Sequence, residues 1–205
     1  MWACLLCLPL GAAGAELSEI LRGIENRYNR ARTLEVLFEQ SYKGQGRAWK
    51  PEQGRLWLRK PGRMRWEYSQ PAGKLFLTDG KFAYLYTPAS RQLERTPLKQ
   101  TEDLRAPLAF LLGRLEFQRD FKRFLWRPEG PDYWVLAEPK SDRLAYSQVE
   151  FLVTPGFEIR LLRITGQDRS VMEFRFWNER LNLPLEEKLF RFEPPPGVRL
   201  IESEL

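Results

Sequence analysis

The chain has 205 residues, of which 43% are hydrophobic and 29% charged, and its formal net charge is +6. This length and apolar fraction are sufficient for one domain with a buried core. Acidic residues are interleaved with the basic ones, so the sequence shows no basic stripe of the kind that follows a nucleic-acid backbone. We therefore expect no nucleic acid among its partners.

The residue types present also limit the chemistry. Histidine is absent, which excludes a Ser-His-Asp triad, a Cys-His pair and a histidine-based zinc site. Paired carboxylates could still act as acid and base, but candidates such as Glu138 and Asp168 lie near predicted turns, where carboxylates are normally solvated. We predict no catalytic residue, no metal site and no cofactor, and we do not expect an enzyme.

Residues 1–15, "MWACLLCLPLGAAGA", predict a secretory signal peptide. An apolar run over 2–10 is followed by the A-x-A cleavage pattern at 13–15. The run is too short to cross a membrane, which takes about 20 apolar residues. We expect cleavage after this pattern, which also removes Cys4 and Cys7 and leaves an exported domain over residues 16–205. The alternative is a buried N-terminal helix, which the proline and glycine of this segment disfavour.

Residues 17–32 predict one amphipathic helix. Apolar side chains recur here at helical spacing, and the opposite face is polar and charged. The apolar positions are Leu17, Ile20, Leu21, Ile24, Tyr28 and Ala31. We expect this helix to cover a sheet.

From Leu34 the apolar period changes to two residues, which is typical of strands with one buried face. The strands expected in addition to the hairpin described below are 34–42, 55–60, 63–68, 92–95, 117–126, 132–138, 144–153, 157–165, 170–177, 185–192 and 198–202. Many short strands separated by closely spaced turns predict a sandwich or a barrel.

The stretch "RMRWEYSQP" at 63–71 alternates strictly. Met64, Trp66 and Tyr68 share one face, and charged residues occupy the other. An aromatic strand face of this kind packs either against the rest of the protein or against a ligand. Periodicity alone leaves both interpretations open.

A hairpin is predicted directly afterwards, because Asp79-Gly80 is typical of a two-residue type I′ turn. This turn pairs Leu77 with Phe82 and Leu75 with Tyr84. We expect these four side chains to share one apolar face with each other and with the aromatic side of the preceding strand.

Residues 101–114 predict a second, short helix. Pro107 suits the first turn, and Leu108, Leu111 and Leu112 form an apolar stripe. A long sheet that curls on itself encloses a concave face that two helices cannot cover as tightly as a second sheet would. An apolar cavity with a helical lid and a fully packed core both remain possible at this point.

The order of several motifs resembles the LolA family, the periplasmic outer-membrane lipoprotein carriers. These motifs are "GRLWLRKPGRMRWEYSQP", "TDGKFAYLY", "RAPLAFLLG" and the C-terminal "FRFEPPPGV". The sequences "FEQ" at 38–40 and "PK" at 139–140 also fall where that family has them. The resemblance spans about 16–201, and its specificity comes from the ordered set rather than from one motif.

The resemblance implies a mainly β fold, an incompletely closed antiparallel β-barrel (half-barrel) with an α-helical lid over an apolar cavity. It implies a periplasmic chaperone that binds the acyl chains of lipoproteins in this cavity. Such a carrier receives lipoproteins from an inner-membrane lipoprotein-releasing ABC transporter and passes them to an outer-membrane receptor lipoprotein. We expect the chain to act as a monomer.

The resemblance also implies site residues. The expected acyl-binding residues are Met64, Trp66, Tyr68, Leu75, Leu77, Phe82 and Tyr84, and the expected lid residues are Leu108, Leu111 and Leu112. Family members commonly carry arginine before the proline of an "RP" pair, where it ties the barrel to the lid. Here that position is Lys60, and lysine lacks the planar fork that holds several carbonyls in fixed geometry. We expect Lys60 to be a weaker latch.

Two related functions remain as alternatives on the same half-barrel. One is a periplasmic sensor or regulator that binds lipid or protein, although such proteins usually add a second domain. The other is the outer-membrane receptor, which needs a lipidated cysteine at the mature N-terminus, where this sequence has Glu16.

Overall fold

The computed structural model describes residues 12–44, 46–98 and 115–202. Most of the predicted signal peptide and the three predicted lid leucines, Leu108, Leu111 and Leu112, lie outside the described residues. The helix α1 (Ala12–Arg30) confirms the predicted amphipathic helix and starts earlier than expected. Among the described residues, no helix is long and apolar enough to span a membrane.

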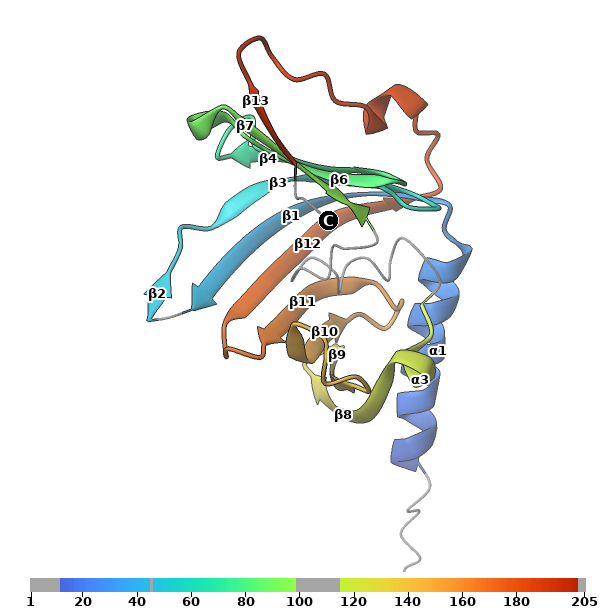
Figure 1. Ribbon diagram of the computed structural model, residues 1–205. Coiled ribbons are helices and arrows are strands. Elements are labelled where there is room, and N and C mark those ends of the chain that lie inside the picture. The colour runs from blue at the N-terminus through green and yellow to red at the C-terminus, as the bar shows by residue number, and fades with distance from the viewer. Residues whose placement is uncertain (1–11, 45, 99–114, 203–205) are drawn as a thin grey trace, which may run out of the picture.

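The rest of the described chain is mainly β (Figure 1). Three short helical segments, η1 (Pro88–Ser90), α3 (Phe117–Asp120) and η3 (Glu187–Phe190), interrupt the strands. The strands are β1 (Thr33–Gly44), β2 (Arg47–Ala48), β3 (Glu52–Arg59), β4 (Arg63–Gln70), β5 (Leu75–Asp79), β6 (Phe82–Thr87), β7 (Gln92–Pro97), β8 (Phe121–Glu129), β9 (Asp132–Pro139), β10 (Tyr146–Val153), β11 (Ile159–Gly166), β12 (Val171–Leu181) and β13 (Arg199–Glu202).

All described strands belong to one 13-stranded sheet with the order β13-β7-β6-β5-β4-β3-β1-β12-β11-β10-β9-β8, and β2 pairs with β1 beside this path. Neighbours are antiparallel except for β13, which pairs parallel with β7. The two end strands do not pair with each other, so the curved sheet stays open (Figure 1). The predicted mainly β, incompletely closed antiparallel sheet is confirmed.

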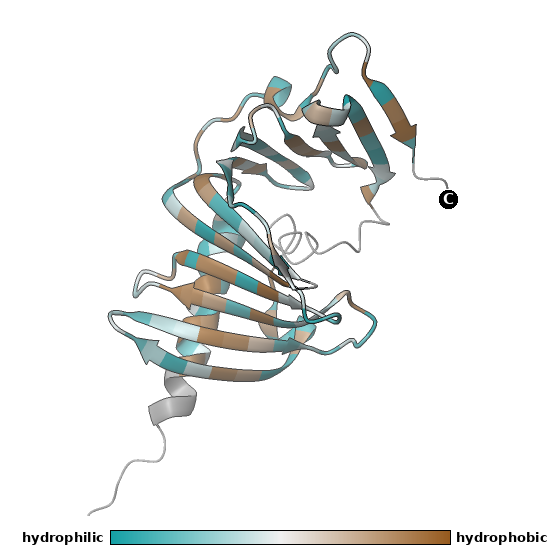
Figure 2. Cartoon of the chain, turned by 90° about the vertical axis from the view of Figure 1, so that its left-hand side faces the viewer, coloured by the Kyte–Doolittle hydropathy of each residue, from teal (hydrophilic) through white to brown (hydrophobic). Residues whose placement is uncertain are grey.

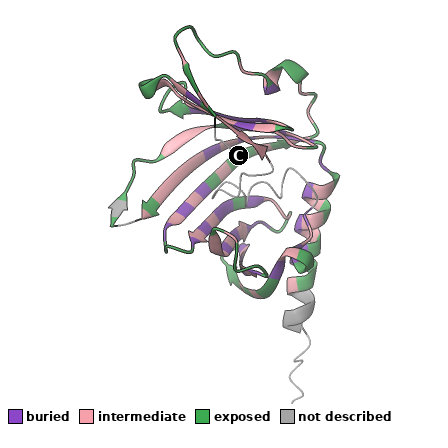
Figure 3. Cartoon of the chain, viewed as in Figure 1, coloured by how far each residue is buried: buried purple, intermediate pink, exposed green. Residues whose placement is uncertain are grey.

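Alternation along the strands gives the sheet an apolar inner face and a charged outer face. Figure 2 shows the change of hydropathy along each strand, and Figure 3 shows the matching change in burial. The buried inner-face residues are Leu34, Val36, Phe38, Leu56, Leu58, Met64, Trp66, Tyr68, Phe76, Ala83, Val135, Ala137, Val149, Phe151, Leu162, Ile164, Met172 and Phe174. Cross-strand pairs such as Leu56 with Trp66 and Leu162 with Phe174 join them into one surface.

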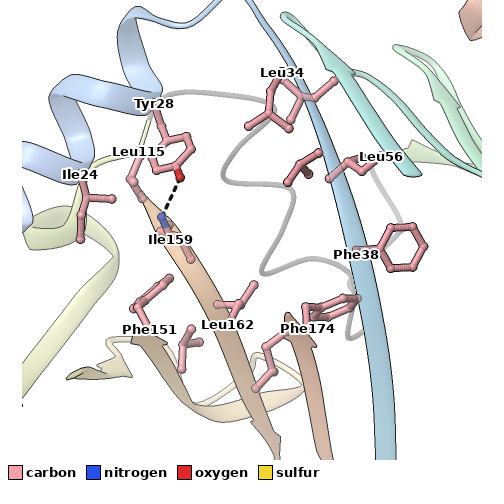
Figure 4. Close-up of a cluster of buried hydrophobic side chains, with 14 of the residues drawn as sticks. Ile24, Tyr28, Leu34, Phe38, Leu56, Leu115, Phe151, Ile159, Leu162 and Phe174 are labelled. Carbon is pink, nitrogen blue, oxygen red and sulfur yellow. Dashed lines mark hydrogen bonds between the residues drawn. The ribbon is translucent and has the colours of Figure 1, made fainter. Parts of the chain in front are cut away.

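The apolar side of α1 packs against this inner face. Ile24 is fully buried and Tyr28 is 4% exposed, and both belong to the same cluster as the inner-face residues. In Figure 4 the Tyr28 side chain points toward Ile159 of the sheet. Burial of apolar side chains on one helical stripe therefore places α1, as the sequence pattern predicted.

The outer face carries rows of paired charges. Arg163 of β11 contacts Glu173 of β12 at 2.8 Å and Glu150 of β10 at 3.6 Å. Arg180 and Arg55 reach Glu35 from either side of β1. Surface pairs of this kind contribute only about 0–1 kcal/mol each, so they keep this face hydrated more than they stabilise the fold.

The predicted strand at 185–192 is wrong. The segment forms η3 and crosses the outer face instead of joining the sheet. Its carbonyl groups accept hydrogen bonds from arginine side chains of the sheet, with Arg59 donating to Leu185 and Arg65 donating to Leu189. Because these carbonyls are bound in this way, the segment does not need a neighbouring strand.

The predicted strand at 117–126 begins too early, because residues 117–120 form α3. The backbone N–H of Phe117 donates to Glu25 Oε1 of α1 at 2.7 Å. The buried Phe117 ring packs against Phe121 and Phe151. Contacts with a distant helix thus override the local alternation of the sequence.

The register predicted for the β5–β6 hairpin is also wrong. Leu77 pairs with Tyr84 rather than with Phe82, so the turn is Gly80-Lys81 instead of Asp79-Gly80. Asp79 Oδ1 accepts from the backbone N–H groups of Lys81 and Phe82 at 2.7 and 2.8 Å. An aspartate that caps the turn through its side chain ends the strand one residue later than the dipeptide signal suggests. A shift of two in pairing leaves each side chain on its expected side of the hairpin.

Candidate functional site

The structure places Met64, Trp66 and Tyr68 together on the inner face, as predicted. All three are buried, with exposed fractions of 3–4%. Trp66 lies between Leu56 of β3 and Phe76 of β5 in the sheet register. This strand contributes the centre of one half of the inner face.

An aromatic cluster joins this strand to the neighbouring ones. The ring of Phe38 lies 4.6 Å from that of Trp66 and 5.2 Å from that of Tyr68, both edge to face. Trp66 also lies 5.4 Å from Phe174 of β12, which stacks on Phe176 at 6.1 Å. Such pairs contribute about 0.5–1.5 kcal/mol beyond area burial, so the cluster forms a firm apolar wall.

The polar atoms of this wall bind one another. The Tyr68 hydroxyl donates to Gln40 Oε1 at 3.0 Å, and Gln40 Nε2 donates to Met172 Sδ at 3.7 Å. The Trp66 indole N–H donates to the sulfur of Met64. Among the described side chains, no buried nitrogen or oxygen lacks a hydrogen-bond partner. An apolar molecule would therefore meet this face without stripping water from unpaired polar groups.

Leu75, Leu77, Phe82 and Tyr84 do not share this face, so the prediction of one common face is wrong. Trp66 pairs with Phe76, and its neighbour Arg65 pairs with Leu77. Since alternate residues of a strand point to opposite sides, the four side chains lie on the outer face.

On the outer face these residues meet the C-terminal segment. Tyr84 donates to Asp79 Oδ2 at 3.0 Å, and the ring of Tyr86 lies 5.2 Å from that of Phe192. Leu77 and Tyr84 line a pocket of about 410 Å³ together with Phe190. The C-terminal segment thus lies beside Leu77 and Tyr84 on the outer face.

Several inner-face residues were absent from the predicted site. Sequence reasoning misses Phe38, Phe76 and Phe174, although each lies beside Trp66 in the sheet or in the aromatic cluster. The signal needed to find Phe76 was the pairing register of β4 with β5. Phe76 stands between Leu75 and Leu77 in the sequence, and only the register shows which of these neighbours point to the inner face. One cross-strand pair, Trp66 with Phe76, would have identified the correct side of the hairpin.

Lys60 connects the sheet to α1. Its ammonium donates to the backbone carbonyl of Tyr28 at 2.7 Å, and its backbone N–H donates to the carbonyl of Arg32. The Tyr28 carbonyl belongs to the last turn of α1, where helix carbonyls lack internal partners and attract cations. Burial lowers the pKa of the Lys60 ammonium from its usual value. Lys60 is therefore a cap on α1, and contact with the predicted lid helix stays a prediction.

A buried carboxylate also holds α1 against the sheet. Glu179 of β12 accepts from Arg27 Nη2 at 2.6 Å and from the hydroxyl of Tyr28 at 2.7 Å. The same hydroxyl accepts the backbone N–H of Ile159 at 2.9 Å, as the dashed line in Figure 4 shows. Burial raises the pKa of Glu179 despite these donors.

A third connection fixes the chain after residue 114. Asn29 of α1 donates to the carbonyl of Leu115 at 2.8 Å and accepts the Leu115 backbone N–H at 2.7 Å. Leu115 is itself 1% exposed within the apolar cluster. The start of this segment is therefore tied to α1 by both backbone and side-chain contacts.

The described residues contain no group of three or more acidic or cysteine side chains that could hold a metal ion. The inner face has aromatic and aliphatic walls and self-satisfied polar atoms. Its chemistry is therefore that of a continuous apolar surface.

The buried Glu179 predicts an unusual pH dependence. A folded pKa raised above the usual 4.5 means that the stabilising contribution is complete below that pH and is lost as pH rises through the folded pKa. We expect wild type to lose stability relative to Glu179→Gln as pH rises above 4.5, measured by urea denaturation at a series of pH values.

Asp168→Asn serves as a control in which the stability difference from wild type is expected to change with pH in the opposite direction. Hydrogen bonds from the side chain and backbone of Ser170 lower the pKa of the exposed Asp168, so wild type should lose stability relative to Asp168→Asn only as pH falls. Parallel pH curves for wild type and Glu179→Gln would contradict the role assigned to Glu179.

Sequence similarity to known proteins extends over most of the chain. The family model "Outer membrane lipoprotein carrier protein LolA" matches residues 29–193. The outer-membrane lipoprotein carrier protein of Chromobacterium violaceum is 28% identical over 176 residues, covering 85% of this chain and 83% of the relative. The corresponding protein of Methylibium petroleiphilum is 28% identical over 204 residues, covering 98% and 97%.

Solved structures support the fold alone, because their sequence identity is low. MucB superposes with a TM-score of 0.54 at 13% identity, covering 90% of this chain and 70% of its own. An uncharacterized conserved protein of Thermus thermophilus gives a TM-score of 0.53 at 13% identity, covering 92% and 99%. Because the family model extends over most of the sequence, this chain belongs to the LolA family of outer membrane lipoprotein carriers, which transport their cargo and do not catalyse a reaction.

Proposed function

We propose that this protein binds the acyl chains of lipoproteins on the inner face of its sheet and carries them through the periplasm. The observation that carries the proposal is the continuous apolar inner face of an unclosed sheet. The names of its relatives support the cargo class. In this proposal an inner-membrane lipoprotein-releasing ABC transporter loads the carrier, and an outer-membrane receptor lipoprotein unloads it.

The energetics of this face suit an acyl chain. Burial of hydrocarbon contributes about 0.8 kcal/mol per methylene group, so only part of a long chain needs to be covered for useful affinity. The aromatic cluster around Trp66 supplies a preformed wall, and the mutual hydrogen bonds of Tyr68 and Gln40 avoid a desolvation cost. Met64, Trp66 and Tyr68 are proposed as acyl-binding residues on this basis, with Phe38 and Phe174 added.

The proposed location requires export. The apolar N-terminal run and the A-x-A pattern support a signal peptide that is removed after residue 15, which leaves Glu16 first in the periplasmic protein. The mass of protein purified from the periplasm tests this proposal. A mass that still includes the first fifteen residues would contradict it.

Two adjacent residues of β12 test the inner-face proposal directly. Phe176 is half-buried on the inner face, and Trp177, 39% exposed, points to the outer face. We expect Phe176→Gln to weaken the binding of a fluorescent fatty acid about tenfold, since an aromatic side chain contributes about 1.5 kcal/mol or more to apolar burial.

Trp177→Gln is the matched control and should change the dissociation constant less than about twofold. Urea denaturation of both variants separates lost binding from lost folding. The proposal fails if both variants bind the probe like wild type, or if Trp177→Gln weakens binding as much as Phe176→Gln.

Lys60 provides a test of delivery. We propose that the hydrogen bond from Lys60 to the end of α1 stabilises the empty, closed form of the carrier. Cargo binding and this hydrogen bond then oppose each other. Lys60→Leu should fold and load but retain its lipoprotein, whereas Lys60→Arg should favour the empty form because a guanidinium offers more donors. The measurement is transfer of a radiolabelled lipoprotein from the loaded carrier to membranes bearing the receptor. Transfer by Lys60→Leu at the wild-type rate would show that Lys60 is only a structural cap.

A further inference from the structure

A second concave site lies at the end of the sheet, away from the inner face. The pocket has a volume of about 730 Å³ and is formed where α1 leads into β1, where β3 turns into β4, and where the chain leaves β12. Its lining residues are Arg32, Thr33, Arg59, Lys60, Pro61, Asn182, Leu183, Pro184 and Leu185. Three of these are cationic and none is acidic.

Two of the three cations donate hydrogen bonds to backbone carbonyls of the described residues. Lys60 donates to the carbonyl of Tyr28 at 2.7 Å, and Arg59 donates to the carbonyl of Leu185 at 3.3 Å. Arg32 is exposed. None of the three forms an ion pair with an acidic side chain in the part of the chain described. On the nearby outer face, by contrast, arginines such as Arg55 and Arg180 are paired with Glu35.

The backbone around the pocket is fixed by hydrogen bonds. Asn182 Oδ1 accepts the backbone N–H of Arg32 at 3.0 Å, and the Asn182 N–H donates to the carbonyl of Thr33 at 2.9 Å. The Thr33 hydroxyl donates to the carbonyl of Leu183 at 2.6 Å. The three segments that carry the cations are therefore held together before any ligand arrives, which lowers the entropic cost of binding.

We propose that this pocket binds a phosphate-type oxyanion, either free phosphate or the phosphate of a lipid headgroup. Guanidinium groups match the geometry of phosphate oxygens through paired N–H donors. The ammonium of Lys60 uses one of its three donors on Tyr28, so it can donate to an anion while it still caps α1. The apolar walls Pro61, Leu183 and Leu185 leave room beside the cations for the glycerol portion of a headgroup.

The electrostatics of Lys60 also favour an anion here. Burial lowers the pKa of this ammonium, and no carboxylate among the pocket residues offsets that effect. A bound anion would supply the missing counter-charge beside a partly buried cation. The site lies outside the inner face and so extends beyond the carrier function proposed above.

The test is isothermal titration calorimetry of the full mature protein with inorganic phosphate and with glycerol 3-phosphate at low ionic strength. We expect one site per chain. Arg32→Gln should weaken binding about fivefold, and Arg32→Gln combined with Arg59→Gln more than about tenfold, as expected for partly exposed charged contacts. Arg30→Gln is the matched control, because it removes the same charge from an exposed position nearby that does not line the pocket.

The source of the phosphate is distinguished by a third probe, dihexanoyl phosphatidylglycerol. Tighter binding of this lipid than of phosphate, with the same dependence on Arg32, identifies a headgroup, and equal affinities identify a free oxyanion. Phe176→Gln should leave phosphate binding unchanged, so the two proposals fail separately. The proposal is overturned if none of the probes binds, or if Arg30→Gln weakens binding as much as Arg32→Gln.

Discussion

An unclosed β-sheet cannot cover its own apolar inner face, and the rest of this structure follows from that constraint. The helix α1 supplies part of the cover and is held at its C-terminal end by Glu179, which binds Arg27 and Tyr28, and by Lys60, which caps the last turn. Each contact involves a charged group that is partly removed from water. Loss of one partner leaves the other buried and unpaired, which costs more than the pair itself contributes. The helix is thereby fixed to the sheet without closing it.

The two faces of the sheet meet opposite physical requirements. On the outer face, ion pairs such as Arg163 with Glu173 keep the surface hydrated, and the segment around Phe190 covers the apolar side chains of the β5–β6 hairpin. On the inner face, Gln40 and Tyr68 satisfy each other. A hydrocarbon chain bound here, as proposed above, would displace little firmly bound water. The same alternation of residues therefore places charged, hydrated side chains on one face of a strand and apolar side chains on the other.

Local periodicity was enough to predict the helix, most strands and the inner position of Trp66, because each of these depends on neighbours along the chain. The prediction for the hairpin was wrong for a different reason. Both sides of β5 are apolar, so Leu77 and Phe76 could not be told apart without the pairing of β4 with β5. The strand predicted at 185–192 was wrong because arginines of the sheet bind the carbonyls of this segment. These interactions join residues more than a hundred positions apart. Long-range contacts of this kind leave no local pattern.

The proposed carrier has to bind firmly and still release, and an open sheet with one anchored helix fits both needs. Since each buried methylene contributes about 0.8 kcal/mol, complete enclosure of a long acyl chain would make release too slow. An open edge limits the area that is covered, and the anchored end of α1 preserves the inner face while cargo leaves. A lysine at position 60 binds the helix carbonyl through a single contact of 2.7 Å, which a flexible ammonium can break and remake without moving the strand. In this structure the cover is therefore held by the buried apolar stripe of α1 together with a few charged contacts at one end of that helix.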